Sequence, residues 1–270
     1  MKFLLISGLA LATGAAALAG DECCPEHSVA PTPTAFIKNA NPPAPGAVAG
    51  TLKGMVKFDG EKPELKPLDI TAEKSQGCVD DGEVDKHDRS VLISKEGGLA
   101  NVIITVEIKG AEVKVPEKAL VLDQKGCRFE PHVVCIPAGA MVQFLNSDAV
   151  SHNVHTYPKK NAEMNKTIPA GSNVEAKLEK TDSINIKCDI HPWMQSWLIV
   201  TDTPHMAVSG ADGNFEIGDL PPGEHTVEWW HETLGKGKEK ITVAEDGSVS
   251  ALEITVSAEK KKSGGGRRKR

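Results

Sequence analysis

Three side chains that bind metals stand within one run of seven residues, Cys188-Asp-Ile-His191-Pro-Trp-Met194. Two further histidines, His152 and His155, lie upstream. A thiolate, two imidazoles and a weak thioether form the ligand set of copper sites that transfer electrons. Zinc favours additional Cys or His ligands and does not need a thioether. The ligand types therefore predict one copper site that alternates between Cu(I) and Cu(II).

Apolar and polar side chains alternate in the residues before Cys188, which predicts a strand that ends at this cysteine. Ile184 and Ile186 share one face with Cys188, because successive side chains of a strand point to opposite faces. The two isoleucines mark the buried face, so the Cys188 sulfur should point into the core at the end of the strand. The tight loop that follows carries His191 and Met194, which lets it fold over a metal held by Cys188.

The same alternation distinguishes the two upstream histidines. His152 shares a face with Val154, whereas Asn153 shares the other face with His155. If Val154 faces the core of a regular strand, His152 faces it too. We therefore predict His152 as the ligand and keep His155 as the alternative.

Taken together, the two motifs resemble those of the cupredoxins. The resemblance rests on Asn-Ser-Asp-Ala-Val-Ser-His-Asn-Val-His at 146–155, followed by Cys-x-x-His-x-x-Met at 188–194, and it covers about 120–201. The short ligand loop is most similar to the amicyanin form, and plastocyanin is a looser match. The resemblance implies a Greek-key β-sandwich with a blue (type 1) copper site.

The resemblance also implies a role for each residue of the site. His152, Cys188 and His191 would be the equatorial ligands, and Met194 the axial one. Asn153 would hold the ligand loops together beside the thiolate, since hydrogen bonds around a metal site orient its ligands. No open coordination position or general base is evident, so an electron carrier is expected and an enzyme is not.

The ligand loop should also be the place where electrons enter and leave. The imidazole edge of His191 is the expected exit, with Pro192 and Trp193 as an apolar patch on which redox partner proteins dock. A Trp193 that packs inward is the alternative. Many relatives have a proline just before the ligand histidine, where this chain has Asp189 and Ile190. A carboxylate beside the thiolate should lower the reduction potential.

The beginning of the chain predicts export. Lys2 is followed by an uncharged run to Ala19, which is typical of a secretory signal peptide over 1–19. A membrane anchor is the alternative, but the run is short for a span and no other apolar run is long enough. We expect a periplasmic or secreted protein, in which disulfides are permitted. A Pro/Ala-rich linker follows over 20–50.

Beyond the linker, short alternating apolar runs separated by Gly, Pro, Asp and Asn predict an all-β protein. The expected parts are a β-rich N-terminal extension (51–118), the cupredoxin-like domain (119–202), a second small β-sandwich module (203–257) and a basic disordered tail (258–270). The second module resembles the carboxypeptidase regulatory-like, prealbumin-like fold, which implies no peptidase activity. The extension either adds strands to the cupredoxin-like sandwich or pairs with the C-terminal module.

Reserving the cysteine of the metal loop leaves five others, which cannot all pair within one chain. A Cys78–Cys127 disulfide is favoured, because each cysteine lies in a loop beside a strand-like run. Cys135 should be a small buried apolar side chain. The pair Cys23-Cys24 is expected to form a disulfide to another molecule, and a metal site there is the alternative.

Two more histidines lie outside the predicted copper site. His132 is expected to be a hydrogen-bonded structural residue, with a second metal site as the alternative. His231, which follows two tryptophans, is expected at the surface, with a position near the copper loop as the alternative.

The formal charge of −6 hides an asymmetry along the chain. The tail 258–270 has seven bases and one acid, and Lys2 adds one more positive charge, so 20–257 carries −13. An acidic body argues against nucleic acid as the main partner. Besides an exported copper electron carrier, two functions remain open, namely a copper-binding or copper-delivery protein that passes no electrons, and a metal-free surface module.

Overall fold

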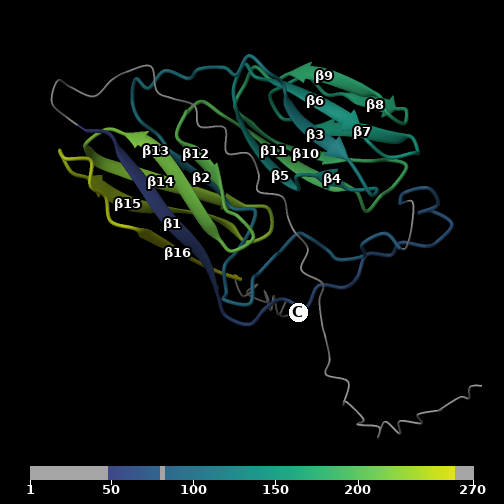
Figure 1. Cartoon of the computed structure of the whole chain (residues 1–270), viewed down its shortest axis with the longest axis horizontal. Helices are drawn as coiled ribbons and strands as arrows, with labels where there is room; N and C mark the ends of the chain where they lie inside the picture. Colours follow the sequence, from purple (N-terminus) through teal and green to yellow (C-terminus); the bar gives the residue numbers. More distant parts are fainter. Residues whose placement is uncertain (1–47, 80–82, 259–270) are drawn as a thin grey trace, which may run out of the picture. The chain divides into compact units, whose positions relative to one another are not determined.

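The computed structural model of the protein describes residues 48–79 and 83–258 (Figure 1). All regular secondary structure within these ranges is β, so the all-β prediction is confirmed. No helix of the described ranges is long and apolar enough to cross a membrane. The predicted signal peptide, nearly all of the linker, the pair Cys23-Cys24 and almost the whole basic tail lie outside the described residues.

A first β-sandwich is formed by the middle of the chain. Its strands are β3 (Leu120–Gln124), β4 (Phe129–Glu130), β5 (Val133–Pro137), β6 (Met141–Asn146), β7 (His152–Tyr157), β8 (Asn165–Ile168), β9 (Asn173–Lys177), β10 (Asp182–Lys187) and β11 (Gln195–Thr201). One sheet has the order β5-β11-β10-β7-β8, and the other has the order β4-β3-β6-β9. Both sheets contribute to one hydrophobic core.

Period-two alternation explains how this core forms. In β6, every second side chain is buried, including Val142 and Phe144. In β10, Ile184 and Ile186 are buried in the same way while the residues between them are more exposed. A strand with one apolar face must bury that face against another layer, and here the two sheets do so against each other.

A second β-sandwich combines both ends of the described chain. Its strands are β1 (Gly50–Asp59), β2 (Ile103–Val106), β12 (Met206–Val208), β13 (Asn214–Leu220), β14 (Gly223–His231), β15 (Gly235–Val243) and β16 (Leu252–Ser257). The sheet orders are β13-β1-β16 and β12-β2-β14-β15. A separate hydrophobic core joins the two sheets.

The N-terminal strands lie inside these sheets and not at their edges. β1 pairs antiparallel with β13 on one side and parallel with β16 on the other. β2 lies between β12 and β14. Of the two possibilities for the extension, the strands of 51–118 therefore pair with the C-terminal module. The segment 203–257 forms its sandwich only together with them.

The chain between β1 and β2 contributes to the first sandwich. We call the described residues 68–79 and 83–89 the strap. Its side chains Ile70 and Val84 are buried in the core of the first sandwich. A backbone hydrogen bond from Leu68 N–H to the Lys86 carbonyl (2.8 Å) joins its two halves.

Covalent and polar contacts attach the strap to the turn between β3 and β4. Cys78 of the strap forms a disulfide with Cys127 of the turn, so the favoured pairing is confirmed. The Arg128 guanidinium donates a hydrogen bond to the backbone carbonyl of His87 (2.7 Å). The strap is therefore a fixed part of this end of the sandwich.

Candidate metal centre

Cys188 lies directly after β10, at the start of the loop that leads into β11. Its side chain is 2 % exposed, as the alternation of β10 predicts. Two backbone hydrogen bonds close the loop, from Cys188 N–H to the Met194 carbonyl (3.3 Å) and from Met194 N–H to the His191 carbonyl (2.9 Å). The loop therefore turns back over the cysteine.

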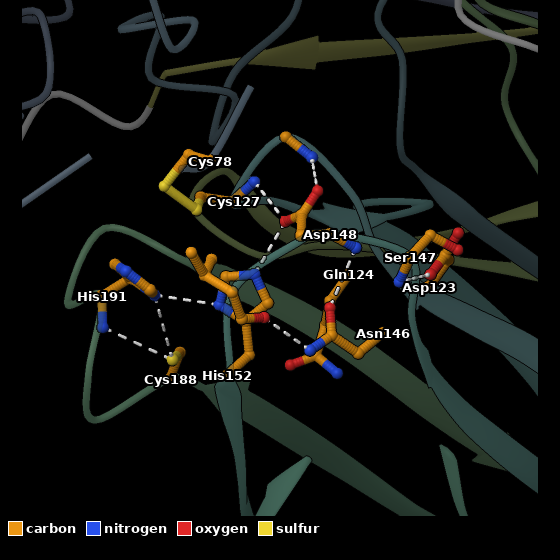
Figure 2. A network of polar contacts seen from close by, with 12 residues as sticks. Cys78, Asp123, Gln124, Cys127, Asn146, Ser147, Asp148, His152, Cys188 and His191 are labelled. Carbon is orange, nitrogen blue, oxygen red and sulfur yellow. Dashed lines mark hydrogen bonds and ion pairs between the residues drawn. A yellow bond between two sulfur atoms is a disulfide. The ribbon is translucent and has the colours of Figure 1, made fainter. Parts of the chain in front are cut away.

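His152 begins β7, the neighbour of β10 in the same sheet. It is fully buried, and its Nδ1 lies 2.9 Å from Nδ1 of His191. Nδ1 of His191 in turn lies 3.9 Å from Sγ of Cys188 (Figure 2). The structure thus brings His152, Cys188 and His191 together as one buried group of potential metal ligands.

His155 lies on the other face of β7, as the alternation predicts. Its side chain is 17 % exposed, with Nδ1 3.0 Å from a carboxylate oxygen of Asp189 and Nε2 3.2 Å from Glu163. His155 contacts two acidic side chains near the surface. The structure does not place it with His152, Cys188 and His191.

Met194, the fourth predicted ligand, lies at the end of the ligand loop. It is fully buried and belongs to the same hydrophobic core cluster as Cys188. A thioether in this environment is shielded from water, which suits a weak metal ligand.

Asn153 links the two segments that carry the potential ligands. Its backbone N–H donates to the Cys188 sulfur (3.3 Å), and its side-chain oxygen accepts from the N–H of Asp189 (3.1 Å). Its amide nitrogen donates to Oδ1 of Asn165 on β8 (2.6 Å). These bonds tie the start of β7 to the ligand loop.

The surroundings of Cys188 favour the thiolate. Burial raises the pKa of its thiol, but hydrogen bonds from the His152 and His191 side chains and from the backbone of Asn153 and His191 outweigh burial and lower the pKa to about 6. For His152, burial lowers the pKa, because it disfavours the charged imidazolium. Interactions with Asp148 and Cys188 outweigh burial, so the pKa of His152 is raised. The thiolate is the form of cysteine that binds metals.

The three side chains fit a copper ion. Separations of 2.9 Å and 3.9 Å between their donor atoms are distances that one ion bonded at about 2.0–2.3 Å to each can bridge. One soft thiolate with two imidazoles suits copper better than the harder divalent ions.

The sequence reasoning missed Asp148. Its Oδ2 lies 2.7 Å from Nε2 of His152, on the side of the ring opposite His191 (Figure 2). Asp148 stands four residues before His152, in the loop that leads into β7. Strand alternation says nothing about a loop residue, so that reasoning could not find it.

His191 is more enclosed than expected. It is 6 % exposed, and its ring lies beside the disulfide, where the sulfur atoms of Cys78 and Cys127 form a second close group with it. Trp193 packs inward, with its Nε1 donating to the Cys127 carbonyl (3.0 Å), while Pro192 is exposed. The expectation of an open imidazole edge is therefore corrected, because the strap and its disulfide cover this side of the ring.

Two further histidines and the other free cysteine of the described chain have structural surroundings. His132 is hydrogen-bonded to Glu232, which fits its expected structural role. His231 is 1 % exposed, so the prediction of a surface position was wrong. Cys135 is partly buried on β5 beside Met206, and burial raises the pKa of its thiol to about 12.

Comparisons with known proteins give only structural likenesses. No family model matches the sequence, and no curated protein matches it. A copper-containing nitrite reductase from Thermus scotoductus SA-01 is 20% identical, with a TM-score of 0.31 over 37% of this chain and 25% of that chain. Amicyanin from Paracoccus versutus is 23% identical, with a TM-score of 0.29 over 36% of this chain and 97% of its own. A purple cupredoxin from Nitrosopumilus maritimus is 20% identical, with a TM-score of 0.27 over 30% of this chain and 99% of its own. Cupredoxins are therefore among the solved structures that part of this chain resembles.

Proposed function

We propose that this chain is an exported blue copper protein that carries single electrons between redox partners. The observation that carries the proposal is the buried group of His152, Cys188 and His191, with a cysteine whose pKa is lowered to about 6. Met194 would be a weak fourth ligand. Copper bound there would supply the one-electron couple between Cu(II) and Cu(I).

The contribution of the protein is to hold the ligands still. Asn153 and the hydrogen-bonded loop fix the relative positions of the ligand segments. The buried core around Cys188 excludes water from the sulfur. A site that needs little rearrangement between two oxidation states suits electron transfer, and that role requires no substrate pocket and no enzyme activity.

Partner proteins would dock close to the ligand loop. His191, Pro192 and Trp193 were the expected contacts, and of these Pro192 is exposed together with the neighbouring Ile190, which is 48% exposed. An exposed apolar pair beside a buried metal site fits a transient protein contact. We therefore propose Ile190 and Pro192 as the contact.

Loading the purified full chain with copper tests this function. A carrier should turn intense blue with one copper per chain, bleach reversibly on reduction, and lose the colour in Cys188→Ser and His152→Ala. Cys135→Ser and His155→Ala are the matched controls and should keep the colour. Tight colourless binding of Cu(I) alone would instead indicate copper delivery, and no uptake would indicate a metal-free surface module.

A further inference from the structure

The Asp148 carboxylate contacts the ring of His152, one of the proposed copper ligands. Resting on the copper site proposed above, we propose that Asp148 is a positioning residue that fixes His152 for metal binding and lowers the reduction potential of the site. The two ring nitrogens of His152 have different neighbours. Nε2 faces Oδ2 of Asp148 at 2.7 Å, and Nδ1 faces His191 at 2.9 Å.

The carboxylate decides which ring nitrogen is free to bind a metal. An ionised carboxylate only accepts hydrogen bonds, so Nε2 of His152 must carry a proton to bond with it. The lone pair of a neutral ring then lies on Nδ1, the atom that faces His191 and Cys188. Histidine ligands are commonly oriented by such a bond from the nitrogen that does not bind the metal.

Asp148 is itself held in place from several directions. Its two oxygens accept hydrogen bonds from the backbone N–H groups of Gly126 (2.6 Å) and Cys127 (2.8 Å), in the turn that bears the disulfide. Its own N–H donates to Oδ1 of Asn146 (3.0 Å), at the end of β6. With 8 % of its surface exposed, Asp148 has little freedom to move away from His152.

Buried Asn146 extends this support to the whole loop. Its amide nitrogen donates to the carbonyls of Val150 (2.8 Å) and Ile168 (2.9 Å). The loop from Asn146 to His152 is thereby closed on itself and attached to β8. The position of His152 is therefore set by polar contacts as well as by its place in β7.

The charge of Asp148 has a second effect. Asp148 and the Cys188 thiolate together carry two negative charges, which balance Cu(II) but leave one charge in excess beside Cu(I). Charges interact strongly in a buried site, because little water is present to screen them. Asp148 should therefore favour the oxidised form and hold the reduction potential low.

The test compares Asp148→Asn with Asp123→Asn in the copper-loaded full chain. Asp123 is a suitable control, because its carboxylate accepts a hydrogen bond from Ser147 N–H (3.2 Å) in the same loop and has no hydrogen bond to His152. Asp148→Asn should weaken Cu(II) binding by about 10- to 100-fold. The potential should rise by about 59 mV for each tenfold by which Cu(II) binding weakens relative to Cu(I). Asp123→Asn should change both quantities far less.

The outcomes separate this inference from the function on which it rests. A wild-type chain that takes up no copper contradicts the proposed function. A blue wild type with an Asp148→Asn variant that matches Asp123→Asn in affinity and potential overturns only the role of Asp148.

If Asp148→Asn does not fold, nitrogen NMR of the wild-type Cu(I) protein decides the question. A proton on Nε2 of His152, protected from solvent exchange, supports the inference. A proton on Nδ1 contradicts it.

Discussion

At the residue scale, the acid that follows Cys188 is not an isolated charge. The Asp189 carboxylate lies 3.0 Å from Nδ1 of His155, and its side chain is 50% exposed. Slight burial lowers the pKa of His155, but hydrogen bonds to Asp189 and Glu163 outweigh it, so the pKa is raised. Because its pKa is raised, His155 keeps its proton to a higher pH, and its positive charge then offsets part of the Asp189 charge. The influence of Asp189 on the copper should therefore be weaker than that of buried Asp148.

We expect Asp189→Asn to raise the reduction potential by less than about 40 mV, since an exposed ion pair contributes at most about 1 kcal/mol. Asp148→Asn should shift it further. Voltammetry of the two variants at equal pH checks the ranking. The ranking fails if Asp189→Asn gives the larger shift.

Alternation placed Cys188 and His152 correctly in the core, because a strand face with buried neighbours fixes the direction of each side chain. The same reasoning could not foresee Asp148 or the burial of His191. Both depend on loops and on the strap, whose positions come from contacts far apart in the sequence.

At the scale of elements, the strap and its disulfide close the end of the first sandwich over His191. The bond joins residues that are 49 apart in sequence, so it removes much freedom from the unfolded chain. It also lies beside Trp193 and the turn that supports Asp148. Stability and metal retention should therefore both depend on it.

The double variant Cys78→Ala/Cys127→Ala should lose about 2–4 kcal/mol of unfolding free energy. It should also release copper to a chelator faster than wild type, because the cover over His191 is no longer fixed. Denaturant unfolding and chelator kinetics measure the two effects. Cys135→Ser is the control, and an equal release rate in all three proteins would show that the strap does not protect the metal.

A buried histidine should make the second sandwich sensitive to acid. Burial lowers the pKa of His231 to about 4, and its Nδ1 accepts hydrogen bonds from the N–H groups of Thr233 (3.2 Å) and Leu234 (3.3 Å). The unfolded chain binds this proton near pH 6.5, so stability is full above that pH and falls as pH drops toward 4.

His231 should therefore cost about 2 kcal/mol of stability between pH 7 and pH 5. In His231→Asn, which keeps an acceptor near the two N–H groups, that part of the pH dependence should disappear. His87→Asn, at an exposed histidine, is the control. Unfolding curves at a series of pH values measure the difference, and parallel profiles for wild type and His231→Asn would refute the assignment.

At the scale of the whole chain, the second sandwich is assembled from segments that flank the first. β1 lies between β13 and β16, although about 150 residues or more separate them in sequence. The sequence shows that both segments are β-rich, but their pairing depends on long-range contacts that alternation cannot specify. That is why the all-β class was predictable and the partner of the N-terminal strands was not.

Removing β1 should therefore disrupt the second sandwich more than the first. In a chain that begins at residue 60, amide hydrogens of β13 and β16 should lose protection from exchange, because their central partner is gone. Those of β6 and β10 should stay protected. A chain that begins at residue 48 is the reference, and retained protection in β13 and β16 would contradict this organisation.

The electron-carrying role of the buried site is tested most directly by a spectroelectrochemical titration of the copper-loaded full chain. We predict that the blue colour disappears and returns reversibly with one electron per copper. His152→Ala and Cys188→Ser should show no such transition. A copper-loaded wild type that does not bleach, or that loses its copper on reduction, would contradict the account.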